Sequence, residues 1–386
     1  MFAGTFFGLY QFDFGGSSWR KITLPVHEER IVDIAEKGDT LLVMSRSFLL
    51  KSTDYINYIK LRLPKPEDYD NKIGLFKTLW VIHSGEIWGI AGKLIVDFVG
   101  LIFIFLSITG LIYFVNRLLI KKRKKKNKDF KSLIKTNKWN LKWHNKIGWI
   151  TIVLLIITTS TGMFLRPPLL IPIANSRVDK IPFSVLDSPN PWFDKLRRII
   201  YDENHNRYII ATLDGIYYSD DNFASKLKKF HPQPPASIMG VNVFENVNDS
   251  TLLVGSFEGL FLWDMKNGDI DDYIKKEPYK KPEIQGPPIG SHVVTGYTKH
   301  LKNKEVYFDF GRGAKLIGSE GQFTPMPSQI EQQPMSLWNL ALEVHTARIY
   351  AFMFGSLYIL VIPLMGLFIL FILVSGFVVW YKKHRK

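Results

Sequence analysis

The stretch Trp80-Val-Ile-His83-Ser-Gly-Glu-Ile-Trp88-Gly runs into the apolar segment Leu94 to Phe114, and the rest of the chain is arranged around it. The apolar segment is too long for a helix of a soluble core, but it suits a membrane span of ~20 residues. The first part places a histidine near one end of that span, where imidazole is costly without a partner. The pattern returns as Glu343-Val-His345-Thr-Ala-Arg-Ile349-Tyr350 before the apolar run Ala351 to Tyr381.

The composition fits a chain that lies partly in a membrane and partly in water. Of 386 residues, 46% are hydrophobic, and the net charge of +15 comes largely from basic clusters. The runs at Lys121–Lys126 and Lys382–Lys386 both adjoin apolar segments, which indicates cytoplasmic retention by the positive-inside rule and not nucleic-acid binding. The chain has no cysteine. Disulfides, thiol catalysis, iron–sulfur ligation and covalent haem attachment are therefore excluded.

A ten-residue repeat marks the water-exposed parts as β structure. It reads Gly4-Thr-Phe-Phe-Gly8-Leu-Tyr-Gln-Phe-Asp13 and returns at Ala211 to Asp220 and at Gly255 to Asp264, with a weaker copy at Met44 to Asp54. The copies begin 40 residues apart before the spans and 44 residues apart after them. Blades of β-propellers repeat every ~40–45 residues. The repeat therefore predicts a propeller-like domain, with a generic β-meander as the alternative.

Repeats on both sides of the first two spans predict a single extracytoplasmic β domain that a membrane hairpin interrupts. The expected segments are β structure at 1–79 and 167–340, membrane helices at 80–117, 147–166 and 341–386, and a basic cytoplasmic loop at 118–146. Charge asymmetry then places the C-terminus in the cytoplasm.

Three details refine the predicted spans. Lys93 and Asp97 are one helical turn apart and are expected to pair near the outer interface. Pro363 is expected to kink the last span. Trp143 and Trp149 suit an interfacial aromatic belt.

The beginning of the chain carries a separate expectation. Met1 to Gly16 does not read as a signal peptide, because it lacks a basic start and carries polar residues. The first repeat also begins without the strand that precedes the other copies. We therefore expect an original N-terminal segment with one more span.

Three histidines lie near ends of the predicted spans. His83 and His345 occupy outer ends and share one local pattern, and His144 lies at the inner end of the second span. Haem b in a helical bundle needs neutral imidazoles from facing helices, so His83 and His345 are candidate axial ligands. The alternative is that they bond to backbone or water. His27, His205, His231, His292 and His300 show no zinc-like spacing.

Two histidine motifs resemble the PepSY-associated transmembrane proteins. Trp143-His144-Asn-Lys-Ile-Gly148 with the later Ser-Thr-Gly162 is similar to one family helix, and Ile82-His83-Ser-Gly-Glu-Ile-Trp-Gly89 with Ser107-Ile-Thr-Gly110 is similar to another. The resemblance implies a multi-pass protein of the bacterial inner membrane, usually with four spans, whose β domain here is periplasmic. Some members are haem-containing iron–siderophore reductases. The resemblance thus implies non-covalent haem b with His83, His345 and His144 as ligands through the haem iron only.

The chain departs from the family in two respects. The usual first helix, with its own cytoplasmic histidine, is missing, so His144 lacks its usual partner. The repeat-bearing β domain also differs from the family's usual soluble part.

Two functions follow as competing hypotheses. In the first, a membrane haem b protein moves electrons to an extracytoplasmic acceptor, such as a ferric siderophore, from a donor that the sequence does not identify. In the second, a non-redox membrane anchor carries a β domain that senses or binds a ligand or periplasmic partner. Transport is disfavoured, because the spans show no buried ionic relay apart from Lys93 and Asp97.

Overall fold

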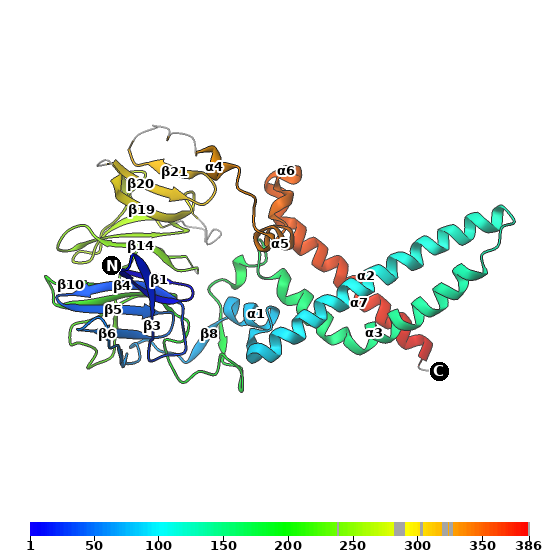
Figure 1. Cartoon of the computed structure of the whole chain (residues 1–386), viewed down its shortest axis with the longest axis horizontal. Coiled ribbons are helices and arrows are strands. Elements are labelled where there is room, and N and C mark those ends of the chain that lie inside the picture. The colour runs from blue at the N-terminus through cyan, green and yellow to red at the C-terminus, as the bar shows by residue number, and fades with distance from the viewer. Residues whose placement is uncertain (238, 282–289, 302–303, 319–322, 324–326, 385–386) are drawn as a thin grey trace. The chain divides into compact units, whose positions relative to one another are not determined.

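The computed structural model describes residues 1–237, 239–281, 290–301, 304–318, 323 and 327–384. The chain forms two compact units (Figure 1). Unit 1 comprises Met1–Asn71 and Ser188–Gln333, and unit 2 comprises Lys72–Asp187 and Pro334–Lys386. Most of the β structure on both sides of the first two spans is therefore part of the same unit, whereas residues 72–79 and 167–187, which we predicted to belong to it, are part of unit 2.

Unit 1 consists of five antiparallel sheets whose strands follow chain order. The short helix α4 (Ser328–Glu331) also belongs to it. The sheets are β1 (Phe2–Thr5), β2 (Gly8–Asp13), β3 (Ser18–Ile22); β4 (Ile31–Lys37), β5 (Thr40–Ser45), β6 (Leu49–Ser52), β7 (Ile59–Leu61); β10 (Leu196–Asp202), β11 (Arg207–Thr212), β12 (Gly215–Ser219), β13 (Lys228–Lys229); β14 (Val241–Asn246), β15 (Thr251–Ser256), β16 (Gly259–Asp264), β17 (Ile270–Asp272), β18 (Glu277–Pro278); and β19 (Val294–Leu301), β20 (Lys304–Asp309), β21 (Gly313–Leu316).

The ten-residue repeat forms the same hairpin each time. Its second residue is Thr5, Thr212 or Ser256, and the hydroxyl accepts a hydrogen bond from the backbone N–H two residues later at 3.0–3.1 Å. The fifth residue is a glycine in each of these copies, with φ between +131° and +147°, a conformation that L side chains rarely adopt. The repeat therefore encodes a hydroxyl-capped turn and the strand that follows it.

The core of unit 1 joins its two chain segments. Leu42, Met44 and Leu49 pack with Trp192 and Leu196 in a buried cluster. Trp192 is 2% exposed, and its indole Nε1–H donates to the carbonyl of Pro64 at 2.8 Å. The strand β10 also donates from Ile199 N–H to Asp33 at 2.8 Å. Burial of these large side chains makes the two segments interdependent for folding.

Successive sheets contact each other through their first strands, β1 with β4, β4 with β10, β10 with β14 and β14 with β19. In the described residues these sheets do not close into a propeller or barrel. The sheets thus do not show the propeller-like arrangement that the repeat spacing predicted. A repeat specifies one sheet and its neighbour, whereas closure depends on how the first and last sheets meet.

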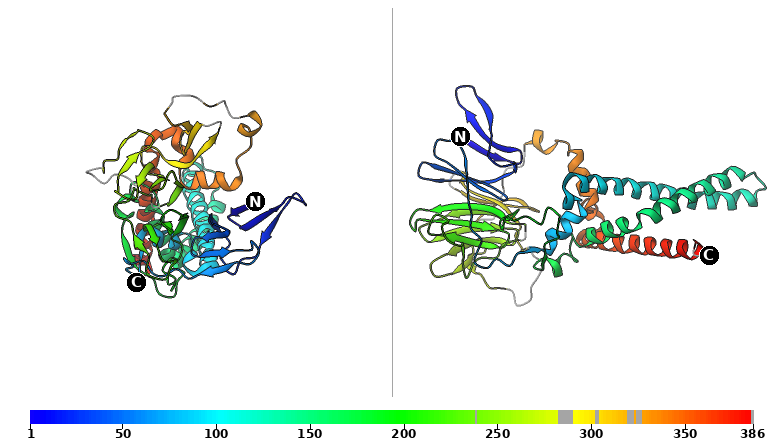
Figure 2. Two further views of the ribbon diagram at one scale, coloured as in Figure 1. Left: turned by 90° about the vertical axis from the view of Figure 1, so that its left-hand side faces the viewer. Right: turned by 90° about the horizontal axis from the view of Figure 1, so that it is seen from below.

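Unit 2 consists of helices and one small sheet. Its elements are β8 (Lys72–Gly74), α1 (Leu75–His83), η1 (Glu86–Trp88), α2 (Gly89–Lys125), α3 (Lys131–Met163), η2 (Ile171–Ile173), β9 (Arg177–Asp179), α5 (Leu337–His345), η3 (Arg348–Tyr350), α6 (Ala351–Phe354), η4 (Gly355–Leu360) and α7 (Val361–His384). The helix α3 packs against both α2 and α7 (Figure 2).

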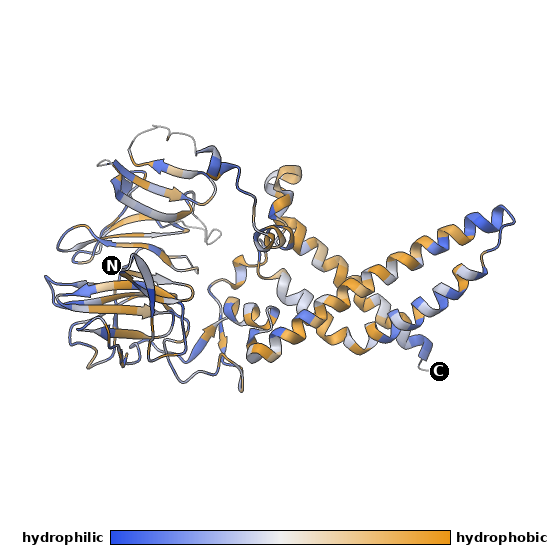
Figure 3. Cartoon of the chain, viewed as in Figure 1, coloured by the Kyte–Doolittle hydropathy of each residue, from blue (hydrophilic) through white to orange (hydrophobic). Residues whose placement is uncertain are grey.

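Three segments of the described chain are long and apolar enough to cross a membrane: Glu86–Lys125, Lys131–Met163 and Arg348–His384. Apolar residues cover most of these helices, and hydrophilic residues gather at the α2–α3 connection and the end of α7 (Figure 3). Val99, Ile102 and Leu155 form their buried core, with Leu373 packed against it. Close helix packing in a bilayer depends on such van der Waals contacts.

Three local features differ from the sequence-based predictions. The basic segment expected as a loop is mostly helical, because α2 continues to Lys125 and α3 begins at Lys131; lysine is a good helix former. Pro363 lies in the first turn of α7 and directly after the 3-10 segment η4, so the irregular part of this span precedes the proline, whereas we predicted a kink within one long α-helix. Lys93 Nζ lies 3.2 Å from Glu86 Oε1 and pairs with that carboxylate, whereas we predicted Asp97.

Candidate functional site

Two matched segments position His83 and His345. Each histidine ends a nine-residue helix, α1 or α5. Two residues later the backbone is left-handed, at Gly85 (φ +75°) and Ala347 (φ +60°), and a three-residue 3-10 helix follows in both. The shared pattern of histidine, Ser or Thr, two variable residues, isoleucine and an aromatic residue therefore encodes one structural unit that occurs twice.

The left-handed position gives a prediction with opposite signs in the two copies. A Cβ on Gly85 would lie 2.3 Å from the carbonyl oxygen of Gly92, so Gly85→Ala forces the backbones apart. We expect it to lower the thermal unfolding midpoint of the purified protein by an amount equivalent to about 1–3 kcal/mol. Ala347→Gly relieves a strained conformation. It should leave the free energy of unfolding unchanged or raise it by up to about 1 kcal/mol, with a matching change in the midpoint. Equal destabilisation by both variants would contradict this assignment.

The imidazoles of His83 and His345 lie together. Their ring centroids are 6.0 Å apart, and the ring planes make an angle of 33°. His83 Nδ1 lies 2.9 Å from the backbone carbonyl of Thr158 on α3. Because a carbonyl can only accept, Nδ1 carries the proton and donates it. The Nε2 lone pair of a neutral His83 is then available to a metal, which is the arrangement that usually fixes a ligating histidine.

Gly162 makes room for the His83 ring. A Cβ at this position would lie 2.6 Å from His83 Cε1 and 3.0 Å from Nδ1. Beside it, the hydroxyl of Thr161 donates to its own helix at Ile157 and lies 3.4 Å from His83 Nδ1. The Thr-Gly pair at the end of α3 therefore forms the surface against which the imidazole packs.

A second Thr-Gly pair, Thr109 and Gly110, lies beside His144. Thr109 Oγ1 lies 2.7 Å from His144 Nδ1 and donates its own proton to the Phe105 carbonyl at 2.8 Å. With the hydroxyl proton on the Phe105 carbonyl, the hydroxyl oxygen accepts from His144 Nδ1–H and Nε2 carries no proton. Asn140 Nδ2 donates to the Thr109 carbonyl at 2.6 Å and holds the two helices in register.

The structure separates His144 from the other two histidines. Thr158, which accepts from His83, lies 14 residues beyond His144 along α3, a distance of about 21 Å at 1.5 Å per residue. The three predicted residues thus form one pair and one single site. Trp80, Trp88 and Tyr350, which flank the pair in sequence, are 45%, 58% and 36% exposed.

The partners of the histidines were not predicted from the sequence. Thr158, Thr161 and Gly162 face His83. Thr109 contacts His144, and Asn140 donates to the Thr109 carbonyl. The signal was present, because Thr-Gly occurs in α2 and again in α3. From the sequence, the two Thr-Gly pairs indicated only close helix packing, because a sequence does not show which helix faces which histidine.

The apolar spans, the paired histidines and the separate β unit together define a multi-pass membrane protein with a large domain outside the bilayer. Residues 117–383 match the family described as the PepSY-associated TM region. This match covers more than half of the chain, so the protein belongs to that family. It includes His144 and His345, whereas His83 precedes it. No curated protein and no solved structure is a match for the chain.

Proposed function

We propose that this protein binds haem b between His83 and His345 and moves electrons across the bacterial inner membrane to an extracytoplasmic acceptor. The observation that carries the proposal is the pair of imidazoles with ring centroids 6.0 Å apart, one of which donates its Nδ1 proton to a backbone carbonyl. Haem b bound there would supply reversible one-electron chemistry, with ferric siderophore as the acceptor that the family resemblance suggests.

His83 and His345 would hold the haem, and the haem would supply one-electron redox chemistry. Two imidazoles on one metal, each with a metal–nitrogen bond of about 2 Å, have ring centres about 6 Å apart. The separation of the His83 and His345 rings supports this arrangement. The Thr158 carbonyl holds the His83 tautomer, and Gly162 allows the ring to lie against α3. The chain's own contribution is therefore to orient the donor atoms and to keep His83 neutral at Nε2.

His144 supports a weaker second position in this proposal. Its Nδ1–H is fixed by Thr109, as that of His83 is by Thr158. In the described residues the rings of His83 and His345 lie together, whereas no other imidazole ring packs against His144. We therefore expect the chain to hold haem at His83 and His345 more tightly than at His144.

A visible absorption spectrum of the purified full-length protein tests the proposal. Bound low-spin haem b gives a strong Soret band and sharp α and β bands on reduction with dithionite. The pyridine haemochrome spectrum would give the number of haem molecules per chain, and we expect at least one haem per chain. A protein that was expressed with an adequate haem supply and shows no Soret band would instead be a non-redox anchor for its β domain.

The orientation is a separate prediction. We propose that the β unit is periplasmic and that the α2–α3 connection and the end of α7 are cytoplasmic, because the basic residues gather at those ends. The chain lacks cysteine, so single cysteines can be introduced at the exposed residues Ser225 and Ser132. An impermeant thiol reagent should label Ser225→Cys in intact spheroplasts and Ser132→Cys only after lysis. The reverse pattern would invert the topology.

A further inference from the structure

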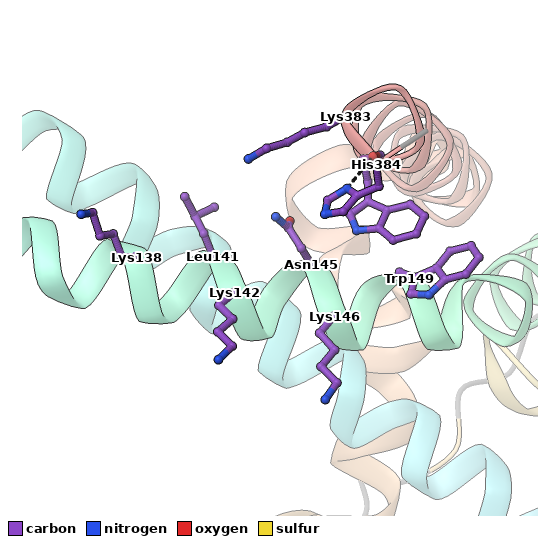
Figure 4. Close-up of a pocket in the computed structure, with 9 residues that line it drawn as sticks. Lys138, Leu141, Lys142, Asn145, Lys146, Trp149, Lys383 and His384 are labelled. Atoms are coloured by element: carbon purple, nitrogen blue, oxygen red, sulfur yellow. Dashed lines mark hydrogen bonds between the residues drawn. The ribbon is translucent and has the colours of Figure 1, made fainter. Parts of the chain in front are cut away.

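A pocket lies between α3 and α7 near their basic ends, away from the histidine pair (Figure 4). Its volume is about 530 Å³. Four lysines line it, Lys138, Lys142 and Lys146 on α3 and Lys383 on α7. None of its nine described lining residues is acidic, so the pocket is strongly electropositive.

The residues that line the pocket change from apolar to basic along α3. Trp149 and Trp380 stack at its apolar side, with ring centroids 4.2 Å apart and planes within 15°. His384 stacks on Trp380 with centroids 4.7 Å apart. In Figure 4, Asn145 points toward His384, and Lys383 and Lys138 extend on the same side of α3. Lys142 and Lys146 extend from the opposite side of α3 and add positive potential around the rim.

This layering matches the boundary between bilayer core and headgroups. On α3 the apolar run begins at Ile147, and on α7 it ends at Tyr381, so Trp149 and Trp380 mark one level in the membrane. Tryptophan favours that level, whereas lysine favours the headgroup layer beyond it. An occupant must therefore present an anionic group to the lysines and an apolar chain to the tryptophans.

We propose that this pocket binds one anionic phospholipid, with the headgroup phosphate near Lys383 and Lys138 and an acyl chain along the Trp149–Trp380 stack. Basic pockets between membrane helices bind acidic headgroups because each nearby lysine attracts the lipid charge. A soluble phosphate compound would satisfy the lysines but leave the indole stack without an apolar partner. The site is independent of the histidine pair, so it stands or falls separately from the proposed haem function.

Native mass spectrometry of the purified full chain tests the site, with phosphatidylglycerol, phosphatidylcholine or free glycerol phosphate added in separate titrations. We expect tight binding of one phosphatidylglycerol, at least about tenfold weaker binding of phosphatidylcholine, and no competition by glycerol phosphate. The double variant Lys138→Gln/Lys383→Gln should weaken phosphatidylglycerol binding about 25-fold, about fivefold for each lysine.

The matched control is Lys135→Gln/Lys382→Gln. It removes the same charge from the same two helices, but neither residue lines the pocket. We expect it to bind phosphatidylglycerol within about twofold of the unmodified protein. An equal loss in both double variants would show diffuse attraction and no site. Equal binding of phosphatidylcholine would also overturn the proposal, and displacement by glycerol phosphate would assign the pocket to a soluble phosphate compound.

Discussion

His83→Ala and His345→Ala should each abolish the low-spin haem b spectrum of the purified protein. Each variant removes one of the two imidazoles whose centroids lie 6.0 Å apart, and six-coordinate binding requires both. The remaining histidine leaves iron with one axial protein ligand, so any retained haem should become high-spin with a broadened Soret band. Reduced-minus-oxidised absorption spectra at matched protein concentration measure this change.

His300→Ala is the matched control for these two variants. His300 lies in β19 of unit 1, so its loss should leave the spectrum unchanged. His144→Ala should reduce the haem content less than either ligand variant, because His144 lies elsewhere on α3. If His83→Ala and His345→Ala both kept the full low-spin spectrum, the assignment of this pair would be wrong.

Gly162→Ala should lower haem retention 10- to 100-fold although it removes no candidate ligand. The added Cβ would lie 2.6 Å from His83 Cε1 and would push the imidazole away from the Thr158 carbonyl. Loss of a group that orients a ligating histidine typically costs that much affinity. Overpacking should also destabilise unit 2 by about 1–3 kcal/mol. Haem content after washing with apomyoglobin measures retention.

The equivalent glycine in α2 provides the matched comparison. Gly110 follows Thr109 as Gly162 follows Thr161, but a Cβ on Gly110 would lie 3.9 Å from His144 Cε1, an ordinary contact. Gly110→Ala should therefore retain the haem and unfold at nearly the same temperature. Equal haem loss in both variants would point to general damage of the helix packing and not to displacement of His83.

The sequence alone determined the elements that depend on local pattern. Apolar length identified the three spans, because a bilayer requires ~20 apolar residues whatever their neighbours are. The ten-residue repeat indicated β hairpins with a glycine at the turn, because hydroxyl capping and positive φ are local properties. The similar sequences around His83 and His345 likewise fold into two copies of one segment, a helix followed by a turn and a 3-10 helix.

Only the tertiary structure decided which distant groups meet. Placement of Thr158 and Gly162 against His83 depends on the rotation and depth of α3, which no local pattern of residues encodes. The same applies to the Thr109–His144 contact and to the stacking of Trp149 on Trp380. Lys93 paired with Glu86 and not Asp97, because η1 places that carboxylate beside the start of α2. Sequence spacing fixes neighbours along one helix, whereas contacts between helices follow from the packing of the whole unit.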